Sequence, residues 1–302
     1  MRRLFILVIA LIVLGGPIAL GLTKPGTVPA AALVAYTANL DNGRTMFFAG
    51  GCASCHATPN QEDPMRLGGG RALPSPFGTF RVPNISSHTR DGIGGWSEAQ
   101  FVNAVLKGAS PRGEHYYPAF PYTSYQRMRL ADVRDLFAFM KILPAVEGRP
   151  AGHDMPFPFN LRAGIGVWKF RYFDGRPFRP DPAKSEIWNR GAYLVAGPGH
   201  CAECHSPRDF MGGIIREQRF AGGPNPTGEG SIPNITQNEN ALAKWSEADF
   251  ENLLATGATP GGDSVGGDMR LVVRNTAQLP SDDRKAMAHY LKSLPPKAGP
   301  QK

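Results

Sequence analysis

Two five-residue stretches, Cys52-Ala-Ser-Cys55-His56 and Cys201-Ala-Glu-Cys204-His205, decide the fold of this 302-residue chain. Each follows the pattern C-x-x-C-H, the attachment motif for a c-type haem. Two thiols at this spacing reach the two vinyl groups of one porphyrin and form thioethers, and the adjacent histidine then binds the iron through an imidazole nitrogen. The sequence therefore predicts two covalently bound haem c groups. Their attachment residues are Cys52, Cys55, His56, Cys201, Cys204 and His205, with His56 and His205 as iron ligands.

The cysteine count argues against other uses of these motifs. All four cysteines of the chain lie in the two motifs, so none remains as a catalytic nucleophile. A zinc site built from two C-x-x-C pairs needs no histidine after each pair. Disulfides suit an exported protein, but they would close very small loops here. A thioredoxin-like site expects one pair in a βαβ setting, so haem attachment is the favoured interpretation.

An internal repeat extends the argument to the whole chain. The two motifs lie 149 residues apart, and three other pairs of segments recur at nearly the same offset. The pairs are Val82-Pro-Asn-Ile-Ser86 with Ile232-Pro-Asn-Ile-Thr236, Trp96-Ser-Glu-Ala-Gln-Phe101 with Trp245-Ser-Glu-Ala-Asp-Phe250, and Leu143-Pro144 with Leu294-Pro295. We therefore predict one domain duplicated, at residues 36–148 and 185–302, joined by a linker at 149–184.

Helices are the expected secondary structure of both copies. One helix should precede each haem motif, at residues 41–50 and 189–196. Ser97 and Ser246 are each expected to cap a helix that ends at Gly108 or Gly257. A final helix is expected around Val133–Met140, with its partner starting at Ser281. No convincing alternating strand is present, so the predicted fold class is all-α, with helices and long loops around each haem.

The N-terminus has the pattern of an export signal or a membrane anchor. Arg2 and Arg3 precede an uncharged apolar stretch of 19 residues from Leu4 to Leu22. We expect a membrane-spanning helix that stays attached, with the two arginines on the cytoplasmic side. A cleaved signal, which would leave a periplasmic protein, is the alternative. Residues 1–35 are thus predicted to form a signal-anchor helix followed by a short tether.

The charge of the chain is unevenly distributed. The formal net charge is +8, of which the linker at 149–184 contributes +4 and residues 1–35 contribute +3. No basic helix or lysine and arginine run is present, which argues against nucleic-acid binding. Arginines of the linker, such as Arg171 and Arg179, alternate with aromatic residues. We expect the linker to pack between the two copies and its arginines to pair with haem propionates; a solvated surface strap is the alternative.

Several motifs outside the haem sites indicate a family resemblance. They are Gly92-Ile-Gly94, Trp96-Ser97, Tyr117-Pro-Ala-Phe-Pro-Tyr122, Phe157-Pro-Phe-Asn160, Pro180-Asp-Pro182 and Trp188-Asn-Arg-Gly-Ala-Tyr-Leu194. With the haem motifs, each copy resembles the class I cytochrome c domain. Residues 41 to about 296 resemble the cytochrome c subunits of bacterial membrane-associated dehydrogenases, which serve alcohol, aldehyde, gluconate or nicotinate oxidation. Those subunits commonly carry a third haem domain and often anchor through the C-terminus, whereas the apolar stretch here is N-terminal.

The resemblance implies two tandem class I cytochrome c domains and a role in electron transfer. The expected donor is the catalytic subunit of a periplasmic dehydrogenase, and the expected acceptor is a further cytochrome, an oxidase or the quinone pool. The chain would sit at the periplasmic face of the bacterial inner membrane, as a non-catalytic subunit rather than an enzyme. Two alternatives stay open: a membrane-tethered shuttle without a dedicated dehydrogenase, and a peroxidase-like haem enzyme with an open first haem.

The sixth iron ligands follow from the same resemblance. A class I haem usually takes a methionine sulfur opposite its histidine, and Met269, in a glycine-rich stretch, is the candidate in the second copy. In the first copy, the related subunits tend to have methionine where this chain has Phe120. Met128 is therefore the predicted ligand of the first haem, although it aligns with Leu279, a core position. His115 and an open iron are the alternatives.

Overall fold

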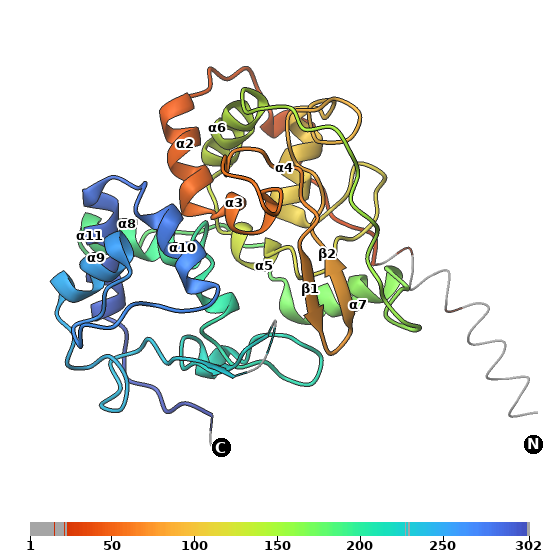
Figure 1. The fold of residues 1–302 in the computed structure, drawn as a ribbon. Coiled ribbons are helices and arrows are strands. Elements are labelled where there is room, and N and C mark those ends of the chain that lie inside the picture. The colour runs from red at the N-terminus through yellow and green to blue at the C-terminus, as the bar shows by residue number, and fades with distance from the viewer. Residues whose placement is uncertain (1–14, 16–20, 22, 227, 229, 301–302) are drawn as a thin grey trace, which may run out of the picture.

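The computed structural model describes residues 15, 21, 23–226, 228 and 230–300 (Figure 1). The predicted N-terminal membrane helix therefore lies almost wholly outside the described residues. Within the part of the chain that the structure does describe, no helix has the length and apolar character needed to cross a membrane. We call residues 36–148 the first repeat and residues 185–302 the second repeat, after the sequence repeat.

Each repeat is built from a helix before the haem motif that packs on a helix near its end. In the first repeat α2 (Leu40–Ala49) packs against α6 (Leu130–Lys141), and in the second α8 (Glu186–Ala196) packs against α11 (Ser281–Lys292). Glycine allows both close contacts. A side chain at Gly43 would overlap the carbonyl of Asp135, and one at Gly191 would overlap the carbonyl of Ala286. The repeat thus extends from sequence to helix packing.

The predicted capped helices are confirmed. Ser97 caps α4 (Glu98–Lys107) in a capping box with Gln100, and Ser246 caps α9 (Glu247–Thr256) in a capping box with Asp249. Both helices end at a glycine in the left-handed region, Gly108 and Gly257. The last helix of the second repeat begins at Ser281, as predicted.

The structure adds elements that the sequence pattern did not indicate. Two short antiparallel pairs are present: β1 (Ala72–Ser75) with β2 (Gly78–Arg81), and β3 (Gly223–Pro224) with β4 (Ser231–Ile232). They are only two to four residues long, which is too short for the sequence to show a period of two. Further helical segments are α3 (Cys52–His56), α5 (Tyr122–Tyr125), α7 (Ala163–Tyr172), α10 (Met269–Thr276) and the 3-10 turns Ala30–Ala32, Cys201–Glu203 and Arg216–Gln218.

The two repeats share their packing rather than standing apart. The buried apolar side chains of both form one contiguous cluster, which includes Phe47 and Met46 of α2 and Leu194 of α8. The hydroxyl of Tyr193, on α8, donates to Asp132 on α6 and accepts from the backbone N–H of Arg129. A core residue of the second repeat therefore holds the start of a helix of the first.

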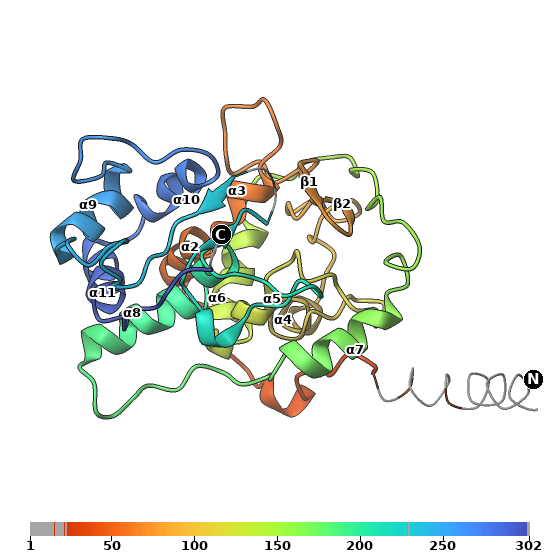
Figure 2. The same ribbon diagram turned by 90° about the horizontal axis from the view of Figure 1, so that it is seen from below.

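The linker and the N-terminal segment both lie against this body (Figure 2). Lys169, on α7, donates to the carbonyls of Lys107 and Gly108 at 2.7 and 2.8 Å. Trp168 Nε1 donates to the Met211 carbonyl at 3.0 Å, so α7 contacts both repeats. Residues 24–35, expected to be a short tether, instead run along the first repeat, and the Val28 N–H donates to Asn103.

Candidate haem sites

A residue in the left-handed region directly precedes each attachment motif. Gly51 has φ of 57° before α3, and His200 has φ of 38° before the turn Cys201–Glu203. All four cysteines are free thiols. Burial raises the pKa of Cys52 and of Cys201 to about 12. Thiols with such pKa values lack the thiolate character of redox-active cysteines, and no cluster of three or more His, Cys, Asp or Glu among the described residues is arranged to hold a metal ion.

The two histidines are oriented identically, and this arrangement fits a haem ligand. His56 Nδ1 lies 2.8 Å from the Pro83 carbonyl, and His205 Nδ1 lies 2.8 Å from the Pro233 carbonyl. A carbonyl only accepts, so Nδ1 carries the proton and Nε2 keeps its lone pair for iron. Burial lowers the pKa of His56 to about 4 and also lowers that of His205, so both imidazoles are neutral, the form that binds metal.

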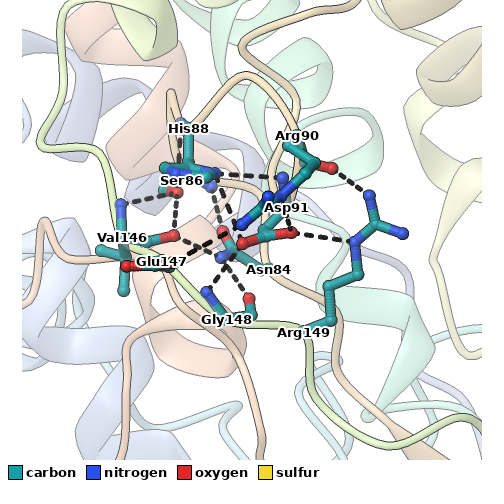
Figure 3. A network of polar contacts seen from close by, with 9 residues as sticks. All are labelled: Asn84, Ser86, His88, Arg90, Asp91, Val146, Glu147, Gly148 and Arg149. Carbon is teal, nitrogen blue, oxygen red and sulfur yellow. Dashed lines mark hydrogen bonds and ion pairs between the residues drawn. The ribbon is translucent and has the colours of Figure 1, made fainter.

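An asparagine fixes the loop that carries each proline carbonyl. Asn84 Oδ1 accepts from the Ser86 N–H at 2.9 Å, an Asx turn, while its Nδ2 donates to the Val146 carbonyl at 2.7 Å (Figure 3). Asn234 repeats this geometry, accepting from Thr236 at 2.9 Å and donating to Lys297 at 2.8 Å. The loop whose proline carbonyl accepts from the ligand histidine is therefore held by its asparagine against the segment that follows the last helix of the same repeat.

In the first repeat a carboxylate strengthens this tie. Asp91 accepts from the Gly148 N–H at 3.0 Å and from Arg149 Nε at 3.1 Å (Figure 3). The Gly148 N–H and the neighbouring Arg90 hold the pKa of Asp91 below its usual value, against the opposing effect of burial. The loop at residues 83–92 is thus fastened at two points to the segment after α6.

The two motifs lie at one interface and contact it in the same way. Ser54 and Glu203 occupy the same position, directly before the second cysteine. Ser54 Oγ donates to the Leu271 carbonyl at 3.2 Å and accepts from Asn275 Nδ2 at 2.9 Å, both on α10. Glu203 Oε1 accepts from Thr123 and Ser124 of α5, both at 2.7 Å. Each motif therefore packs on the segment before the last helix of the other repeat, a self-complementary contact.

Further contacts surround this interface, and α3 lies beside α10 in both views (Figures 1 and 2). Tyr125 Oη donates to the Gly50 carbonyl at 3.0 Å, and its ring packs edge-on against His200, with centroids 5.5 Å apart. His200 Nε2 lies 3.3 Å from the same carbonyl. The His200 side chain is half-buried between the repeats.

Charged groups of the interface lie near the second cysteine of each motif. Arg71 Nη2 and Asp268 Oδ1 lie 2.6 Å apart across it. Burial raises the pKa of Cys204 to about 11, and the Asp268 carboxylate and the Cys55 thiol add to the rise. Burial by itself raises the pKa of Glu203, but Arg208 and the hydroxyls of Ser124 and Thr123 outweigh it and hold that pKa below its usual value. Glu203 is therefore an ionised carboxylate in the second motif, where that motif contacts α5.

The expected sixth ligands occupy unlike places in the two repeats. Isolated bridges pair Ala109 with His115 and Ala258 with Ser264, at an offset of 149. At this offset Phe120 matches Met269, which is the first residue of α10 rather than a loop residue. Counted back from the last helices, Met128 matches Leu279. Each lies in a turn directly before its last helix, and both side chains are buried.

His115, the alternative ligand of the first haem, has another partner in this structure. Its Nε2 is hydrogen-bonded to the carbonyl of Thr23, and its own carbonyl accepts from Arg162 Nη1 at 2.9 Å. The side chain is buried, and its Nδ1 has no hydrogen-bond partner among the residues that the structure describes. His115 therefore connects the N-terminal segment to the linker.

Paired free thiols followed by an oriented, neutral histidine, present twice in a mostly helical chain, define a haem-binding protein of the c type. Residues 40–144 match the family model for cytochrome c. The chain is 46% identical over 300 residues to a diheme cytochrome c-type protein of Cereibacter sphaeroides, covering 98% of this chain and 99% of that protein. The chain belongs to the cytochrome c family, and covalent haem c is its cofactor.

Two further relatives are subunits of dehydrogenases. A nicotinate dehydrogenase subunit of Pseudomonas putida is 39% identical over 85% of this chain, and the fructose dehydrogenase cytochrome subunit of Gluconobacter japonicus is 34% identical over 87% of it. The chain spans only 21% and 54% of these two proteins. The similarity thus covers only part of each of these two proteins.

Proposed function

We propose that this chain is a dihaem c-type cytochrome that relays electrons from a periplasmic dehydrogenase to a downstream cytochrome, an oxidase or the quinone pool. When bound, haem c supplies reversible one-electron chemistry at iron. The residues of the chain attach the haems, orient their histidines and hold both motifs at one interface. That shared interface supports the proposal, since each of the two C-x-x-C-H motifs packs there on the other repeat. The chain would then be an electron-transfer subunit and not itself a catalyst.

The proposal includes a methionine as sixth ligand at each haem. Met269 follows Asp268, whose charge acts on both Cys55 and Cys204, so this methionine starts close to the attachment motifs. Met128 lies one turn after Tyr125, whose hydroxyl donates to the carbonyl of Gly50, two residues before Cys52. Each candidate thus follows a residue that adjoins an attachment motif.

The proposed location is the periplasmic face of the bacterial inner membrane, with the N-terminal stretch as the anchor. Support comes from the uncharged segment Leu4–Leu22 behind Arg2 and Arg3. Dehydrogenase subunits among the relatives support a catalytic subunit of that class as the partner.

Co-purification tests this proposal. The chain is isolated from gently solubilised membranes with an affinity tag at its C-terminus, and the proteins that accompany it are identified. A stoichiometric dehydrogenase is the expected result, and it would also give the substrate class. A chain that arrives alone, or with oxidase subunits only, would replace the relay from a dehydrogenase with the tethered shuttle.

One observation favours a second candidate, a peroxidase-like enzyme with an open first haem. Phe120, which cannot bind iron, stands at the place of Met269. Exposure of the reduced protein to carbon monoxide distinguishes the two functions. The relay predicts two six-coordinate haems that resist the gas, whereas an open iron binds it at once.

A further inference from the structure

Exposed apolar side chains gather on and around α7. Phe170 is 94% exposed, and Val167, one turn before it on the same face, is also exposed. Phe157 and Leu161 are exposed in the segment that leads into the helix, at 78% and 55%. Such neighbouring exposed apolar residues mark an interaction surface rather than a water-facing one.

A loop of the second repeat packs on the opposite side of α7. The Met211 carbonyl accepts the indole N–H of Trp168 at 3.0 Å, and Tyr172 Oη donates to Asp209 Oδ2 at 2.6 Å. Trp168 and Tyr172 lie two residues before and two residues after Phe170, so they point to the other side of the helix. These contacts hold α7 against the body with Phe170 turned outward.

The N-terminal segment joins the molecule at this helix. Thr23 packs so closely against α7 that a side chain at Gly166 would overlap it. The Thr23 carbonyl is also hydrogen-bonded to His115 Nε2. In both views the chain passes beside α7 where the described residues begin (Figures 1 and 2). The apolar stretch ends at Leu22, so it meets the body one residue away from this contact.

From that point the chain is fastened to the first repeat. Besides the contact of Val28 with Asn103 at 2.7 Å, the Val34 carbonyl accepts from Arg134 at 2.9 Å, and Tyr36 Oη donates to Asp135 at 2.8 Å. A flexible tether would let the haem sites rotate relative to an anchor. These hydrogen bonds instead hold the segment against the first repeat. An anchor that ends at Leu22 would therefore determine which side of the molecule faces the membrane.

The charge around the surface favours one occupant. Lys24 and Arg171 are exposed beside it, and the linker carries an excess of four positive charges. Asp174, the nearest acid after α7, is paired with Arg127 at 2.6 Å. Aromatic side chains combined with lysine and arginine suit the headgroup region of an anionic bilayer.

We infer that this surface, the α7 face, rests on the anionic phospholipid bilayer and holds both haem motifs in one orientation to it. The α7 face consists of Phe157, Leu161, Val167 and Phe170, with Lys24 and Arg171. The inference rests on the proposed N-terminal anchor. Because Thr23 touches α7, the exposed side of this helix lies within the ~5–10 Å depth that interfacial side chains reach.

Spin-label accessibility tests the inference on the full-length, haem-loaded chain in vesicles of phosphatidylglycerol and phosphatidylethanolamine. A nitroxide is attached at Phe170→Cys, with Ile142→Cys, another exposed apolar position, as the matched control. Both sites are exposed, so neither change disturbs the core. The label at 170 should be several-fold more accessible to oxygen relative to a water-soluble nickel chelate than the label at 142.

The other outcomes separate the inference from the anchor. Equal accessibility at both sites in a chain that floats with the vesicles overturns the α7 face and leaves the anchor intact. A chain that does not float overturns both. Shielding at 170 that appears only after a purified dehydrogenase is added assigns the surface to a protein partner and overturns the lipid contact.

Discussion

At the scale of single residues, the position before the second cysteine of each haem motif determines how the motifs meet. Ser54 is small and is hydrogen-bonded to α10. Glu203 is negatively charged; it accepts hydrogen bonds from Thr123 and Ser124 and forms an ion pair with Arg208. The C-x-x-C-H pattern predicts attachment but leaves these two positions free. Nothing in the sequence near Glu203 indicates its hydroxyl partners Thr123 and Ser124, which lie about 80 residues away. Only the offset of 149 residues between the two motifs shows that Ser54 and Glu203 occupy equivalent positions.

The charge of Glu203 should lower the reduction potential of the second haem. A buried carboxylate near the iron stabilises the oxidised form, and the local charge is one of the terms that set a haem potential. Glu203→Gln should raise that potential by on the order of tens of millivolts, measured by spectroelectrochemical titration. Glu217→Gln, at an exposed position, is the matched control and should leave it unchanged. An equal response of both variants would remove Glu203 from this role.

Methionine ligation is tested by near-isosteric changes. Leucine in place of methionine costs less than about 1.5 kcal/mol in a core, so Met128→Leu and Met269→Leu should fold. Each variant should let one reduced haem bind carbon monoxide, while the wild type binds none. If Met128→Leu still excludes the gas, Met128 packs like Leu279 and does not bind iron.

At the scale of elements, local signals predicted most of the helices correctly. Capping boxes at Ser97 and Ser246 and the glycines after each helix act within a few residues, so the sequence shows them directly. Helix α10 and the short strand pairs escaped prediction because packing, rather than periodicity, fixes such short elements. The glycine-rich approach to Met269 made that residue resemble part of a loop. The repeated asparagines are visible in sequence, but their partners beyond the last helices are not.

Asn84 should matter for stability through the loop that orients His56. Asn84→Ala removes an Asx turn and the hydrogen bonds that the Asn84 amide donates to the carbonyls of Val146 and Gly148, at a cost of about 1–3 kcal/mol. Denaturant unfolding followed by circular dichroism measures it, with Asn240→Ala, at an exposed turn position, as the control. A loss no greater than that of the control would contradict the role given to Asn84.

Asp91 should make the same loop sensitive to acid. Its pKa is lowered in the folded state, so its stabilising effect is complete above the ordinary carboxyl pKa of about 3.9 and is lost as the pH falls through the lowered value. The melting temperature of the wild type should therefore exceed that of Asp91→Asn at neutral pH, and the two should converge below about pH 4. A constant difference down to pH 2 would exclude this titration.

At the scale of the whole molecule, the two repeats form one body around the haem motifs. Their apolar residues make a single cluster, and the contact between them is self-complementary in the manner of a two-fold dimer. The repeat could be predicted from sequence, but how its copies face each other could not, because the contacts join residues about 80 and 220 positions apart. The division into separate domains at 36–148 and 185–302 stays a prediction.

The proposed electron relay is tested most directly by asking whether an electron passes between the two haems within one molecule. A redox titration first resolves the two absorption signals, and a flash-generated reductant then delivers less than one electron per molecule of the full-length holoprotein. In an electron relay, reduction should first appear at both haems and then shift toward the one of higher potential, at a rate independent of protein concentration. A rate proportional to protein concentration, or no redistribution at all, would contradict it.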